Sequence, residues 1–217
     1  MTYTSTASKI KAIIFDWGNV IVFYDNERLV SRMSRHFKVS KALFRDVELK
    51  NRLKHDLGMI STKRFVLNMN KGLDRRFSVK EYYSLKKKFR TSKLNIPIIN
   101  IIKNVRKMHC VYVLSNNSSP VRWEIKKYGL GKLFDKVFFS YQAKMKKPNP
   151  RFFRLLLHKT GLSSKECILI DDREDSCRAA RKIGMKAIVF KGNRQLKKEL
   201  AALIQRPLSH TPAGRQA

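Results

Sequence analysis

The sequence contains little cysteine and no long uninterrupted apolar run. Only three of the 217 residues are cysteine, and no two of them have the C-x-x-C spacing of a zinc or redox motif. We therefore expect reduced, packed thiols in a cytoplasmic protein, and no zinc site. The apolar segment at 11–24 is interrupted by Asp16, Gly18 and Asn19, so we expect neither a signal peptide nor a membrane span.

Acidic residues are also scarce. The chain has 16 Asp and Glu against 48 Lys and Arg, a formal net charge of +32. A field of this sign concentrates anions, less strongly at high salt. The densest basic segment is 86–90, and no nucleic-acid-binding motif accompanies it. Two interpretations stay open: a solvated cationic surface, and non-specific binding of polyanions.

The few acidic residues are concentrated at two places. Four of the sixteen lie within 171–175, directly after the apolar run 167–170, and a second apolar run, 13–15, leads into Asp16. Carboxylates a few ångströms apart raise one another's pKa unless a positive charge intervenes. The pattern therefore predicts a cation at the ends of two buried strands.

Apolar periodicity predicts an α/β protein. The length and the apolar share of 43% favour one globular domain with an insert. Short apolar runs predict strands, and longer segments between them predict helices, an alternation typical of a doubly wound parallel sheet covered on both faces. The predicted strands are 11–16, 110–114, 136–139, 167–170 and 187–190, and the predicted helices are 98–107, 150–159, 175–183, 194–204 and one after Pro120.

An insert follows the first predicted strand. Leu29, Met33 and Phe37 recur at intervals of four, which predicts helices from about residue 26 to residue 90. This insert would sit above the carboxyl ends of the strands, where open α/β sheets bind ligands. We thus expect a core at 1–25 and 92–205, a small helical cap at 26–91 and a disordered tail at 206–217.

Four polar segments follow predicted strands in the order Asp16, Ser115, Lys147 and Asp171 with Asp172. In this order they resemble the motifs of the haloacid dehalogenase (HAD) superfamily: an aspartate after the first strand, a Ser or Thr after the second, a later Lys, and an acidic pair. The resemblance extends over about 11–192 and implies a Rossmann-like core with an inserted cap. Each motif alone is weak, but four in order are specific.

Within the superfamily, the first motif is similar to that of the glucose-1-phosphatase-like branch. The string F-D-W-G-N-V at 15–20 matches the pattern F-D-x-G-N-V, and K-P-N-P at 147–150 points the same way. In the insert, 58–65 is similar to a G-x-I-S-x-x-x-F string of such caps. The resemblance implies that cap side chains around Tyr24, Arg64 and Arg90 select the substrate.

The resemblance implies a Mg²⁺-dependent phosphatase acting on a small phosphorylated metabolite. Asp16 would attack phosphorus and form an aspartyl-phosphate that water hydrolyses. Ser115, Asn116 through nearby backbone amides, and Lys147 would bind the phosphoryl oxygens. Asp175 would steady Lys147 or a metal-bound water. The implied Mg²⁺ ligands are Asp16, the Gly18 carbonyl and Asp172, with Asp171 as a second carboxylate ligand or outer partner.

One position departs from many phosphatases of the superfamily. They carry a general acid/base aspartate two residues after the nucleophile, where this chain has Gly18. Since such assistance contributes ~10²- to 10⁴-fold in rate, its loss predicts a slow enzyme, a substitute acid from the cap, or a good leaving group. The glucose-1-phosphatase-like branch also carries Gly there, whereas dehalogenases carry an aromatic residue.

Ordinary structural explanations exist for each motif. A strand-end aspartate can cap the next element, Ser115 can belong to a turn, and Asp172 or Asp175 can cap a helix. Capping, however, needs one carboxylate and not four. The alternative function is a non-catalytic cationic HAD-fold protein that binds nucleic acid or another polyanion, favoured by the charge and by Gly18. A dehalogenase is a third hypothesis. Oligomeric state and physiological substrate stay open.

Overall fold

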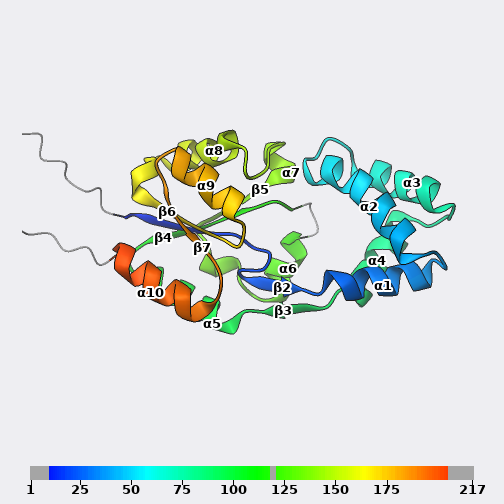
Figure 1. Ribbon diagram of the computed structural model, residues 1–217, viewed down its shortest axis with the longest axis horizontal. Helices are drawn as coiled ribbons and strands as arrows, with labels where there is room; N and C mark the ends of the chain where they lie inside the picture. The colour runs from blue at the N-terminus through cyan, green and yellow to red at the C-terminus, as the bar shows by residue number, and fades with distance from the viewer. Residues whose placement is uncertain (1–9, 118–120, 205–217) are drawn as a thin grey trace, which may run out of the picture.

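The computed structural model describes residues 10–117 and 121–204. The elements form two bodies, which are joined by the short strands β2 (Val22–Tyr24) and β3 (Ser92–Leu94) (Figure 1). No helix in the described ranges has the length and apolarity needed to cross a bilayer. The predicted tail at 206–217 lies outside the described residues.

The larger body is built on a five-stranded parallel sheet with the order β5-β4-β1-β6-β7. The central strand β1 (Ala12–Phe15) is wholly buried and pairs with β4 (Cys110–Ser115) and β6 (Cys167–Asp171). The edges are β5 (Lys136–Phe139) and β7 (Lys186–Val189). Strands covered on both faces have continuous apolar sequences, and for this reason they could be predicted from the sequence. The predicted α/β Rossmann-like fold is confirmed.

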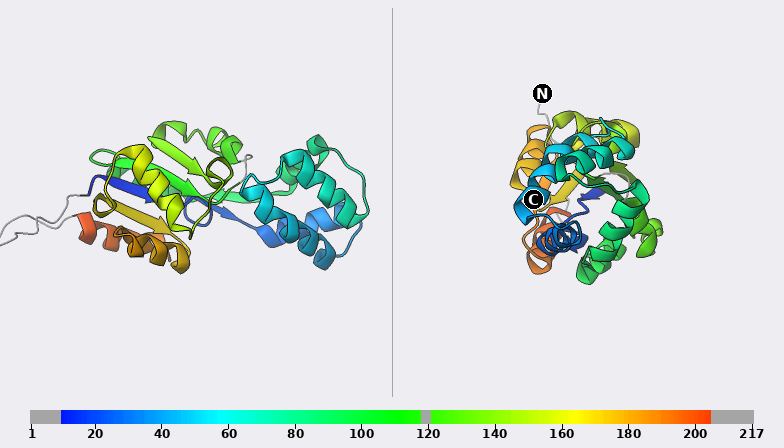
Figure 2. Two further views of the ribbon diagram at one scale, coloured as in Figure 1. Left: turned by 90° about the horizontal axis from the view of Figure 1, so that it is seen from above. Right: turned by 90° about the vertical axis from the view of Figure 1, so that its right-hand side faces the viewer.

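Helices cover both faces of this sheet (Figure 2). Ile13 and Phe15 of β1 belong to the apolar cluster under α5 (Ile96–Val105), α6 (Val121–Lys127) and α10 (Asn193–Ile204). Ala12 and Ile14 face the opposite cluster under α8 (Pro150–Thr160) and α9 (Glu174–Lys182). This alternation follows from the two-residue period of a strand.

The smaller body, which we call the helical cap, consists of α1 (Asn26–His36), α2 (Lys41–Asp56), α3 (Thr62–Leu73) and α4 (Val79–Phe89). It has an apolar cluster of its own, with Phe44, Phe65, Met69 and Tyr82 at its centre. Each helix starts after a residue whose side chain accepts a backbone N–H bond, a favoured N-cap arrangement. These caps are Asp25, Ser40, Ser61 and Ser78.

The chain enters and leaves the helical cap through an antiparallel ribbon that sequence patterns did not predict. In it Val22 pairs with Leu94 and Tyr24 with Ser92. Three-residue strands are too short to show a periodic pattern, so this ribbon emerges only in three dimensions.

A second contact joins the cap to the core at α7 (Ser140–Ala143). There Ser140 Oγ donates to the Asp56 carbonyl at 2.7 Å. Gly58 has φ +63, and a Cβ on it would lie 2.5 Å from the Tyr141 carbonyl oxygen. Glycine is therefore required for this close approach.

The cysteine prediction holds in part. All three thiols are free, and Cys167 and Cys177 are buried, but Cys110 is exposed at the start of β4 and is not packed. Burial raises the pKa of both Cys167 and Cys177 to about 12.

Candidate active site

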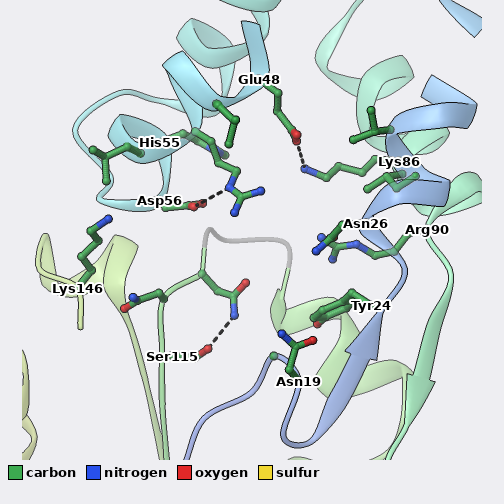
Figure 3. A pocket seen from close by; sticks show the side chains of 18 of the residues that line it. Asn19, Tyr24, Asn26, Glu48, His55, Asp56, Lys86, Arg90, Ser115 and Lys146 are labelled. Carbon is green, nitrogen blue, oxygen red and sulfur yellow. Dashed lines mark hydrogen bonds and ion pairs between the residues drawn. The ribbon is translucent and has the colours of Figure 1, made fainter. Parts of the chain in front are cut away.

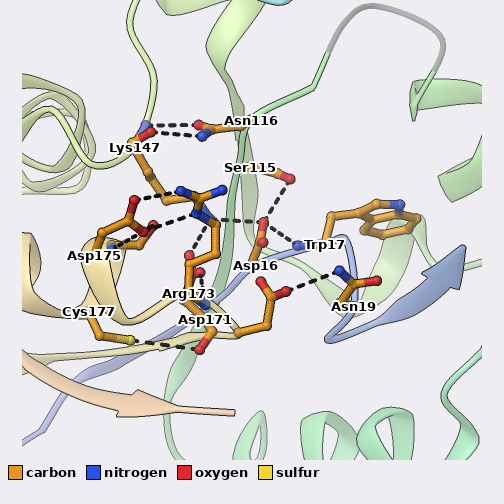
Figure 4. A network of polar contacts seen from close by, with 12 residues as sticks. Asp16, Trp17, Asn19, Ser115, Asn116, Lys147, Asp171, Arg173, Asp175 and Cys177 are labelled. Atoms are coloured by element: carbon orange, nitrogen blue, oxygen red, sulfur yellow. Dashed lines mark hydrogen bonds and ion pairs between the residues drawn. The ribbon is translucent and has the colours of Figure 1, made fainter. Parts of the chain in front are cut away.

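The four predicted motifs meet at the carboxyl edge of the parallel sheet (Figure 4). Asp16 follows β1, Ser115 ends β4 and Asp171 ends β6. These three strands are neighbours with β1 in the middle. Lys147, from the segment between α7 and α8, completes the group. Residues far apart in sequence converge because parallel neighbours end at the same edge.

The two oxygens of the Asp16 carboxylate have different surroundings. Oδ1 accepts hydrogen bonds from the Trp17 amide at 2.7 Å and Ser115 Oγ at 2.8 Å, and contacts Lys147 Nζ at 2.9 Å. Oδ2 has no hydrogen-bond partner among the described residues. The side chain is thus held through one oxygen while the other stays available for attack or for a metal.

Lys147 lies buried between two carboxylates. Its Nζ is 2.9 Å from Asp16 Oδ1 and 2.5 Å from Asp171 Oδ2, and 3% of the residue is exposed. Burial alone lowers the pKa of this ammonium, but the Asp16 and Asp171 carboxylates outweigh it, so the pKa of Lys147 is raised. The lysine therefore presents a permanent positive charge at Asp16.

Asn116 positions that lysine. Its side-chain amide donates to the Lys147 carbonyl at 2.9 Å and accepts from the Lys147 amide at 2.8 Å. The Asn116 side chain is therefore occupied by the protein itself. The expected binding of phosphoryl oxygens by backbone amides near Asn116 stays a prediction.

The members of the acidic pair differ in environment. Asp171 is fully buried and also accepts from the Arg173 amide at 2.9 Å. Burial, aided by the Asp16 charge and opposed by Lys147, raises the pKa of Asp171. Asp172 is half-buried and accepts from Asn19 Nδ2 at 3.1 Å. Asn19 has φ +57, a left-handed conformation that asparagine tolerates better than most residues.

These carboxylates suit a hard divalent cation. Asp16, Asp171 and Asp172 each offer an oxygen, and the three atoms lie within 4.8 Å of one another. Gly18 lines the adjoining cavity, and its carbonyl accepts no hydrogen bond from any described residue. All four groups are oxygen donors, which Mg²⁺ prefers.

Two sequence expectations need correction. Asp175 does not contact Lys147: it forms an ion pair with Arg173 at 2.6 Å and accepts from the Ser176 amide at 2.8 Å at the start of α9. The Arg173 bond lowers the pKa of Asp175. An acidic residue near a helix start is stabilised by that amide and by the helix dipole. Arg64 is exposed on α3 and does not line the cavity in the described structure.

The site opens into a cavity of about 600 Å³ between the core and the helical cap (Figure 3). Asp16, Ser115, Lys147 and Asp172 line its core side. Asn117, which the sequence did not single out, also lines it and donates to Ser115 Oγ at 2.8 Å. From the cap side the cavity is lined by residues that include Arg45, Glu48, Arg52, His55, Asp56, Lys86 and Arg90.

A buried network links the loop after Asp16 to the β2–β3 ribbon, which we call the hinge of the cap. Glu124 of α6, 0% exposed, accepts from Trp17 Nε1 at 3.0 Å, from the Tyr24 hydroxyl, and from Arg90 Nη1 at 2.8 Å. The Arg90 guanidinium also lies 4.7 Å from the Tyr24 ring centroid. Burial and the Glu124 charge raise the pKa of Tyr24. Nothing in the sequence marks Glu124, because one acidic residue in a helix has no distinctive spacing.

A solved structure resembles this chain over most of its length. A HAD family enzyme from Bacteroides thetaiotaomicron, determined in complex with magnesium and inorganic phosphate, superimposes with a TM-score of 0.71 at 25% identity. The match covers 84% of this chain and 94% of that enzyme.

Two curated proteins are similar in sequence. A D-ribitol-5-phosphate phosphatase from Bacteroides thetaiotaomicron is 23% identical over 214 residues, covering 90% of this chain and 98% of the phosphatase. A drimenol cyclase from Aspergillus calidoustus is 32% identical over 102 residues, which are 45% of this chain but only 19% of the cyclase. The family model of haloacid dehalogenase-like hydrolases matches residues 10–184, and the chain belongs to that family.

Proposed function

We propose that the protein is a Mg²⁺-dependent phosphatase that hydrolyses small phosphomonoesters, such as sugar phosphates, through an aspartyl-phosphate. The supporting observation is the asymmetry of Asp16, whose Oδ1 is held by three donors while Oδ2 has no described partner. A carboxylate fixed through one oxygen presents the other in a defined direction, which favours nucleophilic attack.

The chain's own residues then act on the phosphoryl group. Asp16 Oδ2 forms the bond to phosphorus as the ester oxygen leaves, and water later cleaves the acyl phosphate. Ser115 Oγ and the Lys147 ammonium are placed to offset the charge of the phosphoryl oxygens. Mg²⁺, held by Asp16, Asp172, the Gly18 carbonyl and Asp171 directly or through water, would supply further charge neutralisation.

Gly18 cannot protonate a leaving group. We propose that the protein is either a slow phosphatase, an enzyme for esters with good leaving groups, or one that uses an acid from the cap. We also assign it to the glucose-1-phosphatase-like branch on its first motif, F-D-W-G-N-V. The D-ribitol-5-phosphate phosphatase, similar over nearly its whole length, supports a phosphorylated small molecule as substrate. In this proposal the helical cap at 26–91 selects that substrate.

A phosphate-release screen tests the proposal. Sugar phosphates, nucleotides and aryl phosphates are incubated with wild type, with Asp16→Asn, and with the exposed control Asp46→Asn, each with and without Mg²⁺. We expect Mg²⁺-dependent release by wild type and the control, and loss of release in Asp16→Asn with an unchanged circular dichroism spectrum. Wild-type protein that releases no phosphate from any of these esters would contradict the proposal.

The alternative is polyanion binding without catalysis, and a structural observation adds to the net charge and Gly18 in its favour. Trp123 of α6 is 38% exposed, with Lys87 and Lys127 ammonium groups 4.8 and 5.3 Å from its ring centroid. Aromatic rings beside basic groups are typical of single-strand binding surfaces. This function predicts salt-sensitive oligonucleotide binding that survives Asp16→Asn but is lost in Trp123→Ala.

A further inference from the structure

Besides Arg45, which pairs with Glu27 at 2.6 Å, three basic side chains of the helical cap line the cavity opposite the proposed nucleophile. They are Arg52 of α2, Lys86 of α4 and Arg90 at the end of α4, and we call them the roof cluster. Lys86 and Arg90 extend toward the space above Ser115 and Asn19 (Figure 3). The cavity thus has one group of polar residues at its floor and a second group at its roof.

Two members of the roof cluster are loosely paired with acidic residues. Lys86 Nζ lies 3.4 Å from Glu48 Oε1, and Arg52 Nε lies 3.6 Å from Asp56 Oδ2. Charge-assisted hydrogen bonds of this kind are typically about 2.7–2.9 Å long. Both contacts are longer than that, so these cations can accept a better-placed anion.

The third member is held rigidly. Arg90 is fixed by its 2.8 Å bond to Glu124 and by its contact with the Tyr24 ring. A donor fixed in place before the ligand arrives loses little freedom on binding.

The electrostatics of the roof cluster favour an added negative charge. Burial lowers the pKa of Lys86. The Glu48 and Asp56 carboxylates raise it, and the Arg90 and Arg52 charges lower it. Lys86 is therefore a buried cation whose charged form an additional nearby anion would favour. An anion placed among the three cations would relieve their mutual repulsion.

We propose that the roof cluster binds a second anionic group, a carboxylate or a phosphate, at the end of the substrate remote from the phosphoryl group that is hydrolysed. The substrate class is then a phosphorylated acid or a bisphosphate, not a neutral sugar phosphate. The inference rests on the proposed phosphatase function. A cavity of about 600 Å³ is within the range that encloses a small ligand.

Matched pairs of esters test this inference. Two pairs test a carboxylate: the kcat/KM for 3-phosphoglycerate is compared with that for glycerol 3-phosphate, and the kcat/KM for 6-phosphogluconate with that for glucose 6-phosphate. A third pair, fructose 1,6-bisphosphate and fructose 6-phosphate, tests a second phosphate in the same way. We expect at least one pair to favour the doubly anionic member by about tenfold or more, the size of one hydrogen bond to a charged group.

Substitutions test whether the roof cluster causes the preference for doubly anionic esters. Lys86→Met should lower kcat/KM for the doubly anionic esters by about tenfold, and should lower it much less for the singly phosphorylated ones. Glu48→Gln, which removes the competing carboxylate, should increase the preference. The control Lys80→Met removes an exposed charge from the same helix, outside the cavity lining, and should behave as wild type.

Binding measurements separate the two proposals. Dissociation constants for the same ester pairs are measured by calorimetry in the Asp16→Asn background, with and without Lys86→Met. Tighter binding of the doubly anionic ester that Lys86→Met abolishes supports the subsite even if no ester is hydrolysed, a result that would reject only the phosphatase. Equal binding and equal kcat/KM within every pair would overturn the subsite, as would equal losses in Lys86→Met and Lys80→Met.

Discussion

The buried histidine of the helical cap makes stability depend on pH. His55 is 6% exposed, stacks on the Phe65 ring with centroids 4.6 Å apart, and shares a 3.2 Å hydrogen bond between its Nε2 and Thr62 Oγ1. Burial, with a smaller contribution from the Lys86 charge, lowers the pKa of His55 from 6.5 to about 4. The folded protein therefore holds this imidazole neutral in a range where the unfolded chain protonates it.

The sign and size of the effect follow from proton linkage. Between pH 6.5 and pH 4 the unfolded state binds a proton that the folded state does not, so the free energy of unfolding falls as the pH falls through this window. The full effect of that shift is about 3 kcal/mol. About 2 kcal/mol of it is lost between pH 7 and pH 5.

Urea unfolding at pH 7, 6 and 5, followed by circular dichroism at constant ionic strength, measures this loss. The variant His55→Gln has no titrating group at this position and should lose about 2 kcal/mol less than wild type between pH 7 and pH 5. Carboxylates that titrate in the same range contribute to both proteins and cancel in the difference. The control His158→Gln, exposed on α8, should follow the wild type. Equal losses in wild type and His55→Gln would show that His55 does not cause this pH dependence.

Three further predictions concern the core and the hinge. Glu124→Ala leaves Arg90 without its buried carboxylate and should lower the free energy of unfolding by about 3–5 kcal/mol in urea titrations, with a smaller loss for Glu124→Gln; a loss below 1 kcal/mol would contradict the network. Gly58→Ala should destabilise the protein by about 1–3 kcal/mol, because the position has φ +63 and the added Cβ would meet the Tyr141 carbonyl. An unchanged melting temperature in this variant would argue against docking of the cap on α7. Of the three free thiols, only the exposed Cys110 should react promptly with a disulfide reagent in the native protein and all three in urea; rapid native labelling of Cys167 or Cys177 would be inconsistent with their burial.

Much of the core was predictable because its signals are local. Strands buried on both faces appear in the sequence as short apolar runs. The predicted strands 110–114, 136–139 and 167–170 therefore agree with the observed strands to within one residue at each end. Periodicity also predicted the helices of the insert. The motif residues Asp16, Ser115, Lys147 and Asp171 could be selected because each follows or ends such an element, and parallel strands bring their carboxyl ends to one edge.

The contacts that these residues make could be found only from the tertiary structure. It assigned Asp171 to the buried pair with Lys147 and left Asp172 half-buried beside Asn19. In the folded protein Asp175 pairs with Arg173 and not with Lys147, because the Arg173 guanidinium and the backbone amide at the start of α9 bind that carboxylate locally.

The cap hinge and the roof of the cavity depended on the fold in the same way. The ribbon of β2 and β3, the buried Glu124 and the convergence of α2 and α4 on one cavity join segments that are tens of residues apart. A local pattern records the periodicity and burial of one element, but not which other element its side chains will meet. The sequence by itself therefore determined the fold class and the identity of the candidate residues, while the three-dimensional packing determined their partners.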